Sequence, residues 1–405
     1  MPPAIPSAFL SIGFRPFYLG AAIFACLAVP LWMVAVLGAS DGIALSDGGS
    51  ALLRFDLNWH RHEMLFGFAP AVIAGFLLTA ARNWTGLPTP AGGRLAALFG
   101  LWIAGRIAML WPAAGSQPQI AVAALVDLSF LPVLATGLAI VLWRSRNYRN
   151  GFVILILLGL GIANTAFHLD RLGWMSTMPG HQAITLAFDL IAVLMIVIGG
   201  RVTPAFSANA IAGLRPRRWP LLEVLAIGAP VAILLTDAFL PAIDSGWSRE
   251  YRWLLWLTGA VHIVRLAGWQ PWRALSNPLL LALPLAYAWI PAYFLLRAWL
   301  GGEPGLLPPV ATHALAVGAM ASLMLAMMTR SALGHTGRAL RARPVELVCF
   351  GAIHFAALAR VAGPLAMPEA YRLWLMLAAM GWTLAFATFA IAYWPILTRP
   401  RFASS

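Results

Sequence analysis

Eight histidines are the residues best suited to chemistry, and five of them fall at one end of the apolar segments that contain them. A neutral imidazole can ligate iron or copper through one ring nitrogen while the other nitrogen bonds an acceptor. Helical bundles build haem and metal sites from such side chains on facing helices. Helix capping, or a bond to a backbone carbonyl, is the alternative for each ring. The five histidines are His60, His62, His168, His181 and His313.

The spacing of these histidines predicts different roles for them. His60 and His62 stand two residues apart, so on a regular helix they point about 200° away from each other and cannot share one small centre. His62 and His313 lie at comparable depth, about one turn inside their segments. His262 lies deeper in its own segment, where a polar ring is costlier to bury.

Two arginines surround a turn rich in glycine and threonine that contains His335. Arg330 precedes this turn and Arg338 ends it. Guanidinium groups in such an arrangement could hold haem propionates or another anion, because they form paired charge-assisted hydrogen bonds. Contact with lipid headgroups is the alternative explanation.

Three charged residues fall inside apolar segments, where charge usually marks function. They are Arg106, Asp127 and Asp189. All three lie at a similar distance from the same membrane face, so an ion pair between Arg106 and Asp127 on neighbouring helices is expected. Asp189 is then either a second partner or part of a proton path. A purely structural ion pair is the alternative.

Membrane-spanning helices must position these residues, because the sequence suits no other solvent. The chain has 405 residues, of which 61% are hydrophobic and 10% charged, whereas a soluble domain carries roughly 25% charged residues. We expect an all-α, polytopic membrane protein with about twelve transmembrane helices, folded as a single transmembrane domain over residues 1–405. The expected spans, each close to the length that crosses a bilayer, are roughly 17–38, 59–80, 94–113, 120–143, 151–170, 181–203, 219–241, 250–268, 278–298, 309–332, 345–363 and 372–395.

The charge distribution predicts the orientation of these spans. All 27 basic residues are arginines, and the formal net charge is +13. When successive loops are assigned to alternate sides, 18 of the 27 arginines fall on the side of the two termini, and most acids fall on the other side. The positive-inside rule therefore places both termini in the cytoplasm. The excess charge is a topology and lipid-headgroup signal, and we expect no nucleic-acid binding.

Several long motifs in the chain resemble one known family. They are GFRPF at 13–17, WHRHEMLFGF at 59–68, AGFLLTA at 74–80, NWTG at 83–86, GGRVTPAF at 199–206, His262 with Arg265 and Leu266, YAW at 287–289, the segment from HAL at 313–315 to MMTR at 327–330, and LGHTGR at 333–338. Together they extend over nearly the whole chain and resemble the NnrS family.

The resemblance implies a multi-pass protein of the bacterial inner membrane that contains haem, expected as haem b, and copper. It also implies a role in nitric oxide metabolism, denitrification and protection from nitrosative stress, with nitric oxide or an iron–nitrosyl species as the ligand. On this basis we expect His62 and His313 to be the haem axial ligands, with His262 as the rival. We expect His60 and His168 to bind copper or to support its ligands.

Two other functions also fit the composition. A redox enzyme resembling the haem-copper oxidases and nitric oxide reductases would have twelve spans, but this chain lacks the adjacent histidines of their binuclear centre. Its only close pair is His60 and His62. A secondary transporter likewise combines twelve spans with buried charges and predicts no bound metal. The sequence leaves catalysis and oligomeric state open.

Overall fold

The computed structural model describes residues 8–40, 55–110, 116–174, 180–239, 248–301 and 308–401, and every regular element within these ranges is a helix. The expected all-α class is therefore confirmed for this part of the chain. The chain divides into two compact units. Unit 1 comprises Met1–Ala187, Ser331–Ala339 and Phe389–Ser405, and unit 2 comprises Phe188–Arg330 and Leu340–Thr388.

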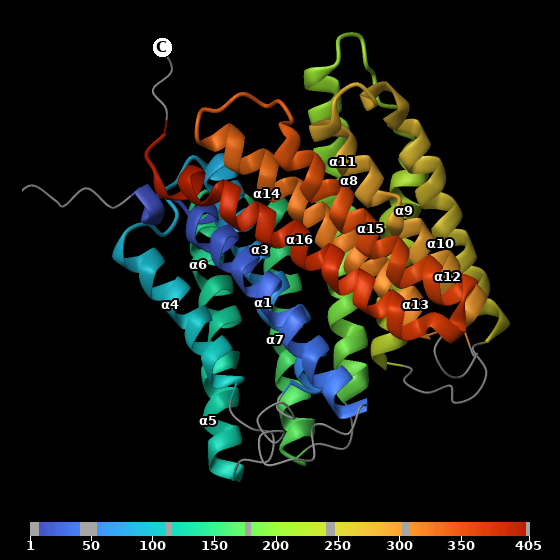
Figure 1. Ribbon diagram of the computed structural model, residues 1–405. Coiled ribbons are helices and arrows are strands. Elements are labelled where there is room, and N and C mark those ends of the chain that lie inside the picture. Colours follow the sequence, from blue (N-terminus) through green and yellow to red (C-terminus); the bar gives the residue numbers. More distant parts are fainter. Residues whose placement is uncertain are drawn as a thin grey trace, which may run out of the picture. The chain divides into compact units, whose positions relative to one another are not determined.

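Unit 1 is built mainly from the first seven α-helices. These helices are α1 (Phe14–Ser40), α2 (Leu57–His62), α3 (Ala69–Thr85), α4 (Gly93–Ala108), α5 (Gln117–Leu128), α6 (Phe130–Arg144) and α7 (Phe152–Arg171). The π-helix η4 (Glu63–Phe68) joins α2 to α3 without a break. Helix α1 packs against α3, α3 and α7 pack against α6, and α4 packs against α5 (Figure 1). Helix α8 (Gly180–Ala210) begins in unit 1 and continues into unit 2.

Unit 2 contains the later helices, apart from the ends of α14 and α16. They are α9 (Pro220–Phe239), α10 (Arg249–Gly268), α11 (Pro278–Tyr287), α12 (Trp289–Leu300), α13 (Pro308–His313), the π-helix η7 (Ala314–Ala321), α14 (Ser322–His335), α15 (Pro344–Ala366) and α16 (Tyr371–Thr398). Helix α10 packs against both α9 and α12, and α15 packs against α13 and η7. Short 3-10 turns are η1 (Ala8–Leu10), η5 (Tyr148–Asn150), η6 (Pro271–Ala274) and η8 (Pro368–Ala370).

Ten helical segments of the described chain are long and apolar enough to cross a membrane. They correspond to ten of the expected spans, so a multi-pass membrane protein is supported. The other two expected spans, about 94–113 and 250–268, are helical as α4 and α10. Helix α4 has 16 residues, slightly short of the roughly 17–25 that cross a bilayer. Helix α10 is long enough but carries four charged side chains, Arg249, Glu250, Arg252 and Arg265.

Two expected spans are each interrupted by a proline. The breaks between α5 and α6 and between α11 and α12 both fall three residues before a proline, Pro132 or Pro291. Proline has no backbone N–H, and its ring clashes with the carbonyl four residues earlier, so the helix is interrupted there. Asp127 and Tyr287 lie beside these two breaks. Both residues take part in the polar clusters described below.

Candidate metal centre

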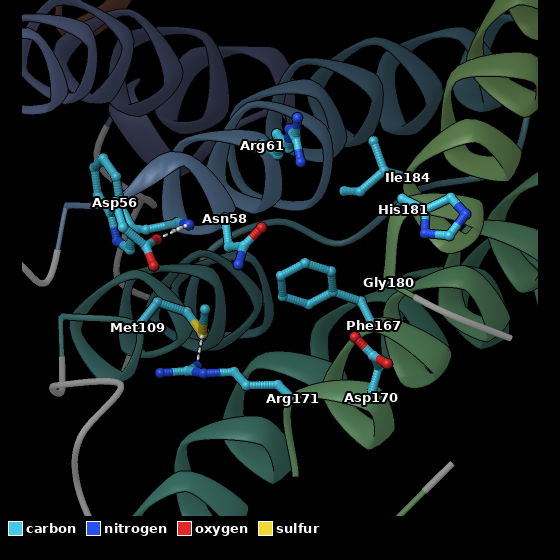
Figure 2. A pocket seen from close by; sticks show the side chains of 11 residues that line it. Asp56, Asn58, Arg61, Met109, Phe167, Asp170, Arg171, Gly180, His181 and Ile184 are labelled. Atoms are coloured by element: carbon cyan, nitrogen blue, oxygen red, sulfur yellow. Dashed lines mark hydrogen bonds between the residues drawn. The ribbon is translucent and has the colours of Figure 1, made fainter. Parts of the chain in front are cut away.

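A cavity of about 340 Å³ lies among the ends of α2, α4 and α7 and the start of α8, all within unit 1. Its wall combines acidic, basic and apolar side chains: Asp56, Asn58, Trp59, Arg61, Met109, Phe167, Asp170, Arg171, Gly180, His181 and Ile184. Figure 2 shows Phe167 in the middle of these side chains. The Phe167 ring also lies 5.0 Å from the ring of the fully buried His62, measured between centroids. Phe167 therefore contacts both the cavity and the buried polar cluster around His62.

The local sequence explains why His62 and its neighbour both lie inside the bundle. Helix α2 begins at an Asp56 cap, whose carboxylate accepts a hydrogen bond from the Trp59 N–H at 2.7 Å. The helix changes to a π-helix at Glu63, and this wider turn changes the angle between successive side chains. His62 and Glu63 are both fully buried, and Nδ1 of His62 lies 2.9 Å from Oε1 of Glu63.

Arg106 on α4 is bound between two carboxylates. Its Nη1 lies 2.5 Å from Oε2 of Glu63, and its Nη2 donates to Oδ1 of Asp127 on α5. The ion pair predicted between Arg106 and Asp127 is therefore confirmed. Gly67 and Gly105 make room for it, because a Cβ atom at either position would lie against Arg106 or Asp127. Glu63 was not predicted as a partner, although its place directly after His62 in an apolar segment was a signal.

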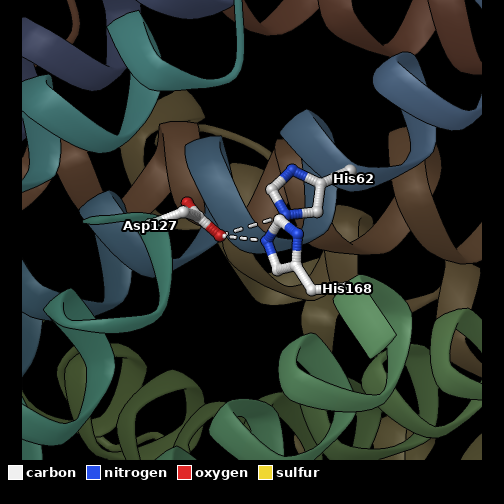
Figure 3. A group of neighbouring side chains, drawn as sticks. All are labelled: His62, Asp127 and His168. Carbon is white, nitrogen blue, oxygen red and sulfur yellow. Dashed lines mark hydrogen bonds and ion pairs between the residues drawn. The ribbon is translucent and has the colours of Figure 1, made fainter. Parts of the chain in front are cut away.

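Two imidazole rings approach the same oxygen of Asp127. Nε2 of His62 lies 3.2 Å from Oδ2 of Asp127, and Nε2 of His168 on α7 lies 3.0 Å from it. Figure 3 shows the two rings directed at this carboxylate from different helices. Asn164, one turn before His168, donates from Nδ2 to the same Oδ2 at 2.7 Å and places its own Oδ1 2.9 Å from Nε2 of His62.

The charges of this cluster balance when His62 is doubly protonated. Both ring nitrogens of His62 face oxygen atoms of Glu63, Asp127 and Asn164, which suits an imidazolium with two N–H donors. Two carboxylates then meet two cations, Arg106 and His62, in a buried site where unpaired charge is costly. A divalent metal ion bound at Nε2 would replace this proton and supply the positive charge instead.

The cluster has the donor set of a transition-metal site. His62, Asp127 and His168 each offer one ligand atom, and these atoms lie within 4.8 Å of one another. Nδ1 of His168 is buried and has no hydrogen-bond partner within the described residues. Two imidazole nitrogens and one carboxylate oxygen suit copper, zinc or iron rather than magnesium or calcium. Arg106, Glu63 and Asn164 would then orient the ligands from outside, as supporting residues do in metal proteins.

The other candidate residues of unit 1 lie outside this cluster. The His60 ring stacks on Trp32, with centroids 4.0 Å apart, and His181 lines the cavity. His335 ends α14, and its ring lies 5.7 Å from that of Phe14. Arg338 follows in the adjoining turn. Four of the five histidines expected to gather lie in unit 1, and among these four the expected gathering is observed for His62 and His168.

In unit 2, His262 belongs to a second buried polar chain. The fully buried His262 has Nδ1 2.8 Å from the Tyr287 hydroxyl, which accepts from Nη1 of Arg265 at 2.9 Å. Arg265 in turn binds Glu223, with Nη2 2.5 Å from Oε2. Nε2 of His262 is buried without a hydrogen-bond partner within the described ranges. This nitrogen is available to a ligand, and Tyr287 would hold its ring in place.

The remaining predicted residues of unit 2 are separate from that chain. Nδ1 of His313 lies 2.6 Å from the Pro309 carbonyl, and the guanidinium of Arg330 lies 4.4 Å above the Phe206 ring. Asp189 binds Arg297, with 3.5 Å between Oδ1 and Nη1. The sequence predicted either a second ion-pair partner or part of a proton path at Asp189. It did not predict Arg297 as the partner of this carboxylate.

The family model described as "NnrS protein" matches residues 8–401, which is nearly the whole chain. The matched range includes all residues of the cluster around Asp127 and of the chain around His262. No curated protein matches the sequence.

Proposed function

The chain belongs to the NnrS family, as its motifs predicted, and from this premise we propose that it is a haem- and copper-containing protein of the bacterial inner membrane. In this proposal it takes part in nitric oxide metabolism and protects the cell from nitrosative stress. The observation that supports the proposal best is the buried cluster of His62, Asp127 and His168, because it places transition-metal ligands inside membrane-type helices.

The proposed membrane topology has twelve spans with both termini in the cytoplasm. Ten spans rest on long apolar helices, and α4 and α10 supply the other two. The charges that distinguish α10 support this assignment. Arg265 is buried and paired with Glu223, while Arg249, Glu250 and Arg252 lie in its first turn, where a membrane interface would solvate them. The excess of arginine on the side of the termini agrees with it.

Copper is the metal that we assign to the His62, Asp127 and His168 cluster. Imidazole nitrogens are preferred copper ligands, and a carboxylate completes an oxygen–nitrogen set that suits Cu(II). Asn164 and Glu63 bond the ligands and would fix the orientation of the His62 ring. When bound, copper supplies one-electron redox chemistry and a coordination position for a small ligand. His60 stays a predicted copper ligand, although its ring stacks on Trp32.

Haem requires an axial ligand with a ring nitrogen that makes no other bond, and within the described residues Nε2 of His262 meets this requirement. Its Nε2 is buried without a described partner, while Nδ1 bonds Tyr287, which is the arrangement of a histidine prepared to bind a metal. His62 and His313 stay predicted as axial ligands. The contacts of His62 favour the copper cluster, since both of its ring nitrogens already face carboxylate or amide oxygens. Arg330 and Arg338 stay predicted contacts of the propionates, and His335 stays a predicted haem-binding residue.

The cavity beside Phe167 would give a small neutral ligand a route to the cluster. Its volume of about 340 Å³ exceeds what a diatomic molecule needs, and Phe167 in its wall also contacts the His62 ring. Nitric oxide is uncharged and small, so an aromatic ring that turns aside could admit it without exposing the buried charges. An iron–nitrosyl species is larger than nitric oxide, so it would bind in the cavity and would not reach the cluster.

The decisive experiment is metal analysis and absorption spectroscopy of the purified full-length protein. We expect a Soret band and bound copper in the wild type. His168→Ala should lose copper and keep haem, whereas His354→Ala, a control in unit 2 whose ring accepts from Trp289, should keep both. Protein without haem and copper would contradict the proposal and favour a transporter. Turnover of nitric oxide by the metal-loaded protein would identify an enzyme.

A further inference from the structure

A second arginine bound between two carboxylates lies in unit 2, and neither carboxylate belongs to a candidate metal ligand. Arg297 on α12 places Nη2 2.5 Å from Oδ2 of Asp237 on α9 and Nη1 3.5 Å from Oδ1 of Asp189 on α8. Two tyrosines complete the group. The Tyr251 hydroxyl on α10 donates to Oδ1 of Asp237 at 2.6 Å, and the Tyr293 hydroxyl on α12 accepts from Nη1 of Arg297 at 3.0 Å.

One oxygen of this group is left without a partner. Oδ2 of Asp189 is buried and makes no hydrogen bond within the described residues, and the Asp189 side chain is only 3% exposed. Arg297, the cation that binds Asp189, makes its shorter contact with Asp237. Burying a carboxylate oxygen in this way costs free energy, because the oxygen loses its bound water and gains no hydrogen bond in return.

The charges in this group do not balance as they do around Arg106. In unit 1, a doubly protonated His62 would supply a second positive charge beside Glu63 and Asp127. In unit 2, Tyr251 and Tyr293 take the place that His62 has in unit 1, and a neutral phenol supplies no positive charge. Within this group of described side chains, two carboxylates and one guanidinium therefore leave one negative charge unbalanced. A buried carboxyl group in that position binds a proton, because the neutral form costs far less to bury.

We propose that Asp189 and Asp237 form a buried proton-binding site around Arg297, with the proton held on Oδ2 of Asp189. The charged and titratable groups near it are Asp189 on α8, Asp237 on α9, Tyr251 with the first-turn residues Arg249, Glu250 and Arg252 on α10, Tyr293 and Arg297 on α12, and His313 on α13, which packs against α12. Arg252 donates to the Gly301 carbonyl at 2.9 Å, and Nδ1 of His313 bonds the Pro309 carbonyl. These bonds direct both groups to backbone oxygens.

The two carboxyl groups differ in access, which gives the site a direction. The Asp237 side chain is 13% exposed and lies near the end of α9, whereas Asp189 is 3% exposed. A proton would therefore arrive through Asp237 and reside on Asp189, moving between two carboxyl groups that bind the same guanidinium. Such pairs of acids are the usual elements of proton relays in membrane proteins.

Infrared spectroscopy of the full-length protein tests the site independently of metal content. At neutral pH we expect the C=O stretching band of a protonated carboxylic acid, which shifts when the protein is made with isotope-labelled aspartate. Asp189→Asn should abolish this band. Asp237→Asn should abolish it too, because Asp189 then pairs alone with Arg297 and ionises. Glu250→Gln, which alters an exposed acid on α10, should leave it unchanged.

The proposal is overturned if the wild type has no aspartate-dependent band, or if the band survives both substitutions. Carboxylate bands that respond to sodium in place of a C=O band would also overturn it, since they would indicate an alkali cation at Asp189. If Asp189→Asn fails to fold, labelled wild-type protein and Asp237→Asn still decide the question.

Discussion

His62 and His168, which lie on different helices, direct their Nε2 atoms at one and the same oxygen, Oδ2 of Asp127, at 3.2 and 3.0 Å. A shared carboxylate oxygen is a compact arrangement for two imidazoles, and it leaves the three ligand atoms close enough to bind one metal ion. Asp127 is therefore the residue on which both the charge balance and the proposed copper site depend.

Replacing Asp127 with Asn tests that dependence. Asparagine keeps the size of the side chain but removes the negative charge, so we expect copper affinity to fall on the order of 100-fold. The measurement is copper bound per protein across a competing chelator series. Asp170→Asn is the matched control, because Asp170 lines the neighbouring cavity without joining the cluster. Equal copper affinity in both variants would exclude Asp127 as a ligand.

The Arg106–Asp127 ion pair predicts a non-additive effect on stability. Replacing either residue with Ala leaves the buried cluster with an unbalanced charge and should cost about 3–5 kcal/mol of unfolding free energy, measured by thermal unfolding in detergent. The double replacement should recover part of that loss, although Glu63 stays without Arg106. Arg61→Ala, at an exposed position, should change stability by less than about 0.5 kcal/mol. Strictly additive losses would show that the two side chains do not interact.

The orphaned nitrogen of His262 predicts that this residue holds haem. His262→Ala should remove the Soret band or convert it to a high-spin form, because one axial imidazole would be lost. His354→Ala should preserve the spectrum. If the spectrum survives loss of His262 but disappears in both His62→Ala and His313→Ala, the assignment to His262 is wrong. The pair of axial ligands predicted from the sequence, His62 and His313, is then correct.

The contact between Phe167 and His62 predicts control of access to the metal. Phe167→Ala should speed removal of copper by a water-soluble chelator several-fold, because the ring that covers His62 is gone. Ile184→Ala enlarges the same cavity from α8 and keeps the Phe167 ring beside His62, so it should leave the rate near that of wild type. Equal rates in the two variants would argue against a route through Phe167.

The arginine distribution predicts the topology. Reporter fusions after Arg149 and after Arg218 should both report the cytoplasm, since these arginines lie on the side assigned to the termini. A fusion near Asp47, a position outside the described residues, should report the periplasm. The reverse pattern would invalidate the span order.

Hydropathy and charge were enough to predict the helices and one buried contact. Apolar runs of bilayer length predicted the spans, and two opposite charges at similar depth predicted the Arg106–Asp127 pair, because an unpaired charge in such a place is costly. The breaks before Pro132 and Pro291 could have been predicted as well, since proline interrupts a helix for a local reason.

The other members of the cluster could not be predicted from the sequence, because the type and spacing of a residue do not show which side chains it will face. Asn164 is a lone neutral polar residue in an apolar run, and nothing in its spacing indicates that it faces Asp127. Glu63 follows His62 at the point where the helix widens to a π-turn, and hydrophobic periodicity does not reveal a π-turn. Arg297 and Asp237 stand near helix ends, where solvated charge is expected, so their burial was not foreseen.

The π-helical turn that follows His62 makes the site sensitive to helix type as well as to substitution. A π-turn holds roughly one residue more than an α-turn, so the six residues Glu63–Phe68 rotate the chain by less than they would in a regular α-helix. If the same six residues closed into a regular α-helix, His62 would rotate by roughly 100° relative to α3 and would point away from Asp127, although every side chain of the cluster would still be present. The backbone hydrogen-bond pattern of these six residues is therefore as much a determinant of the site as the identity of its ligands.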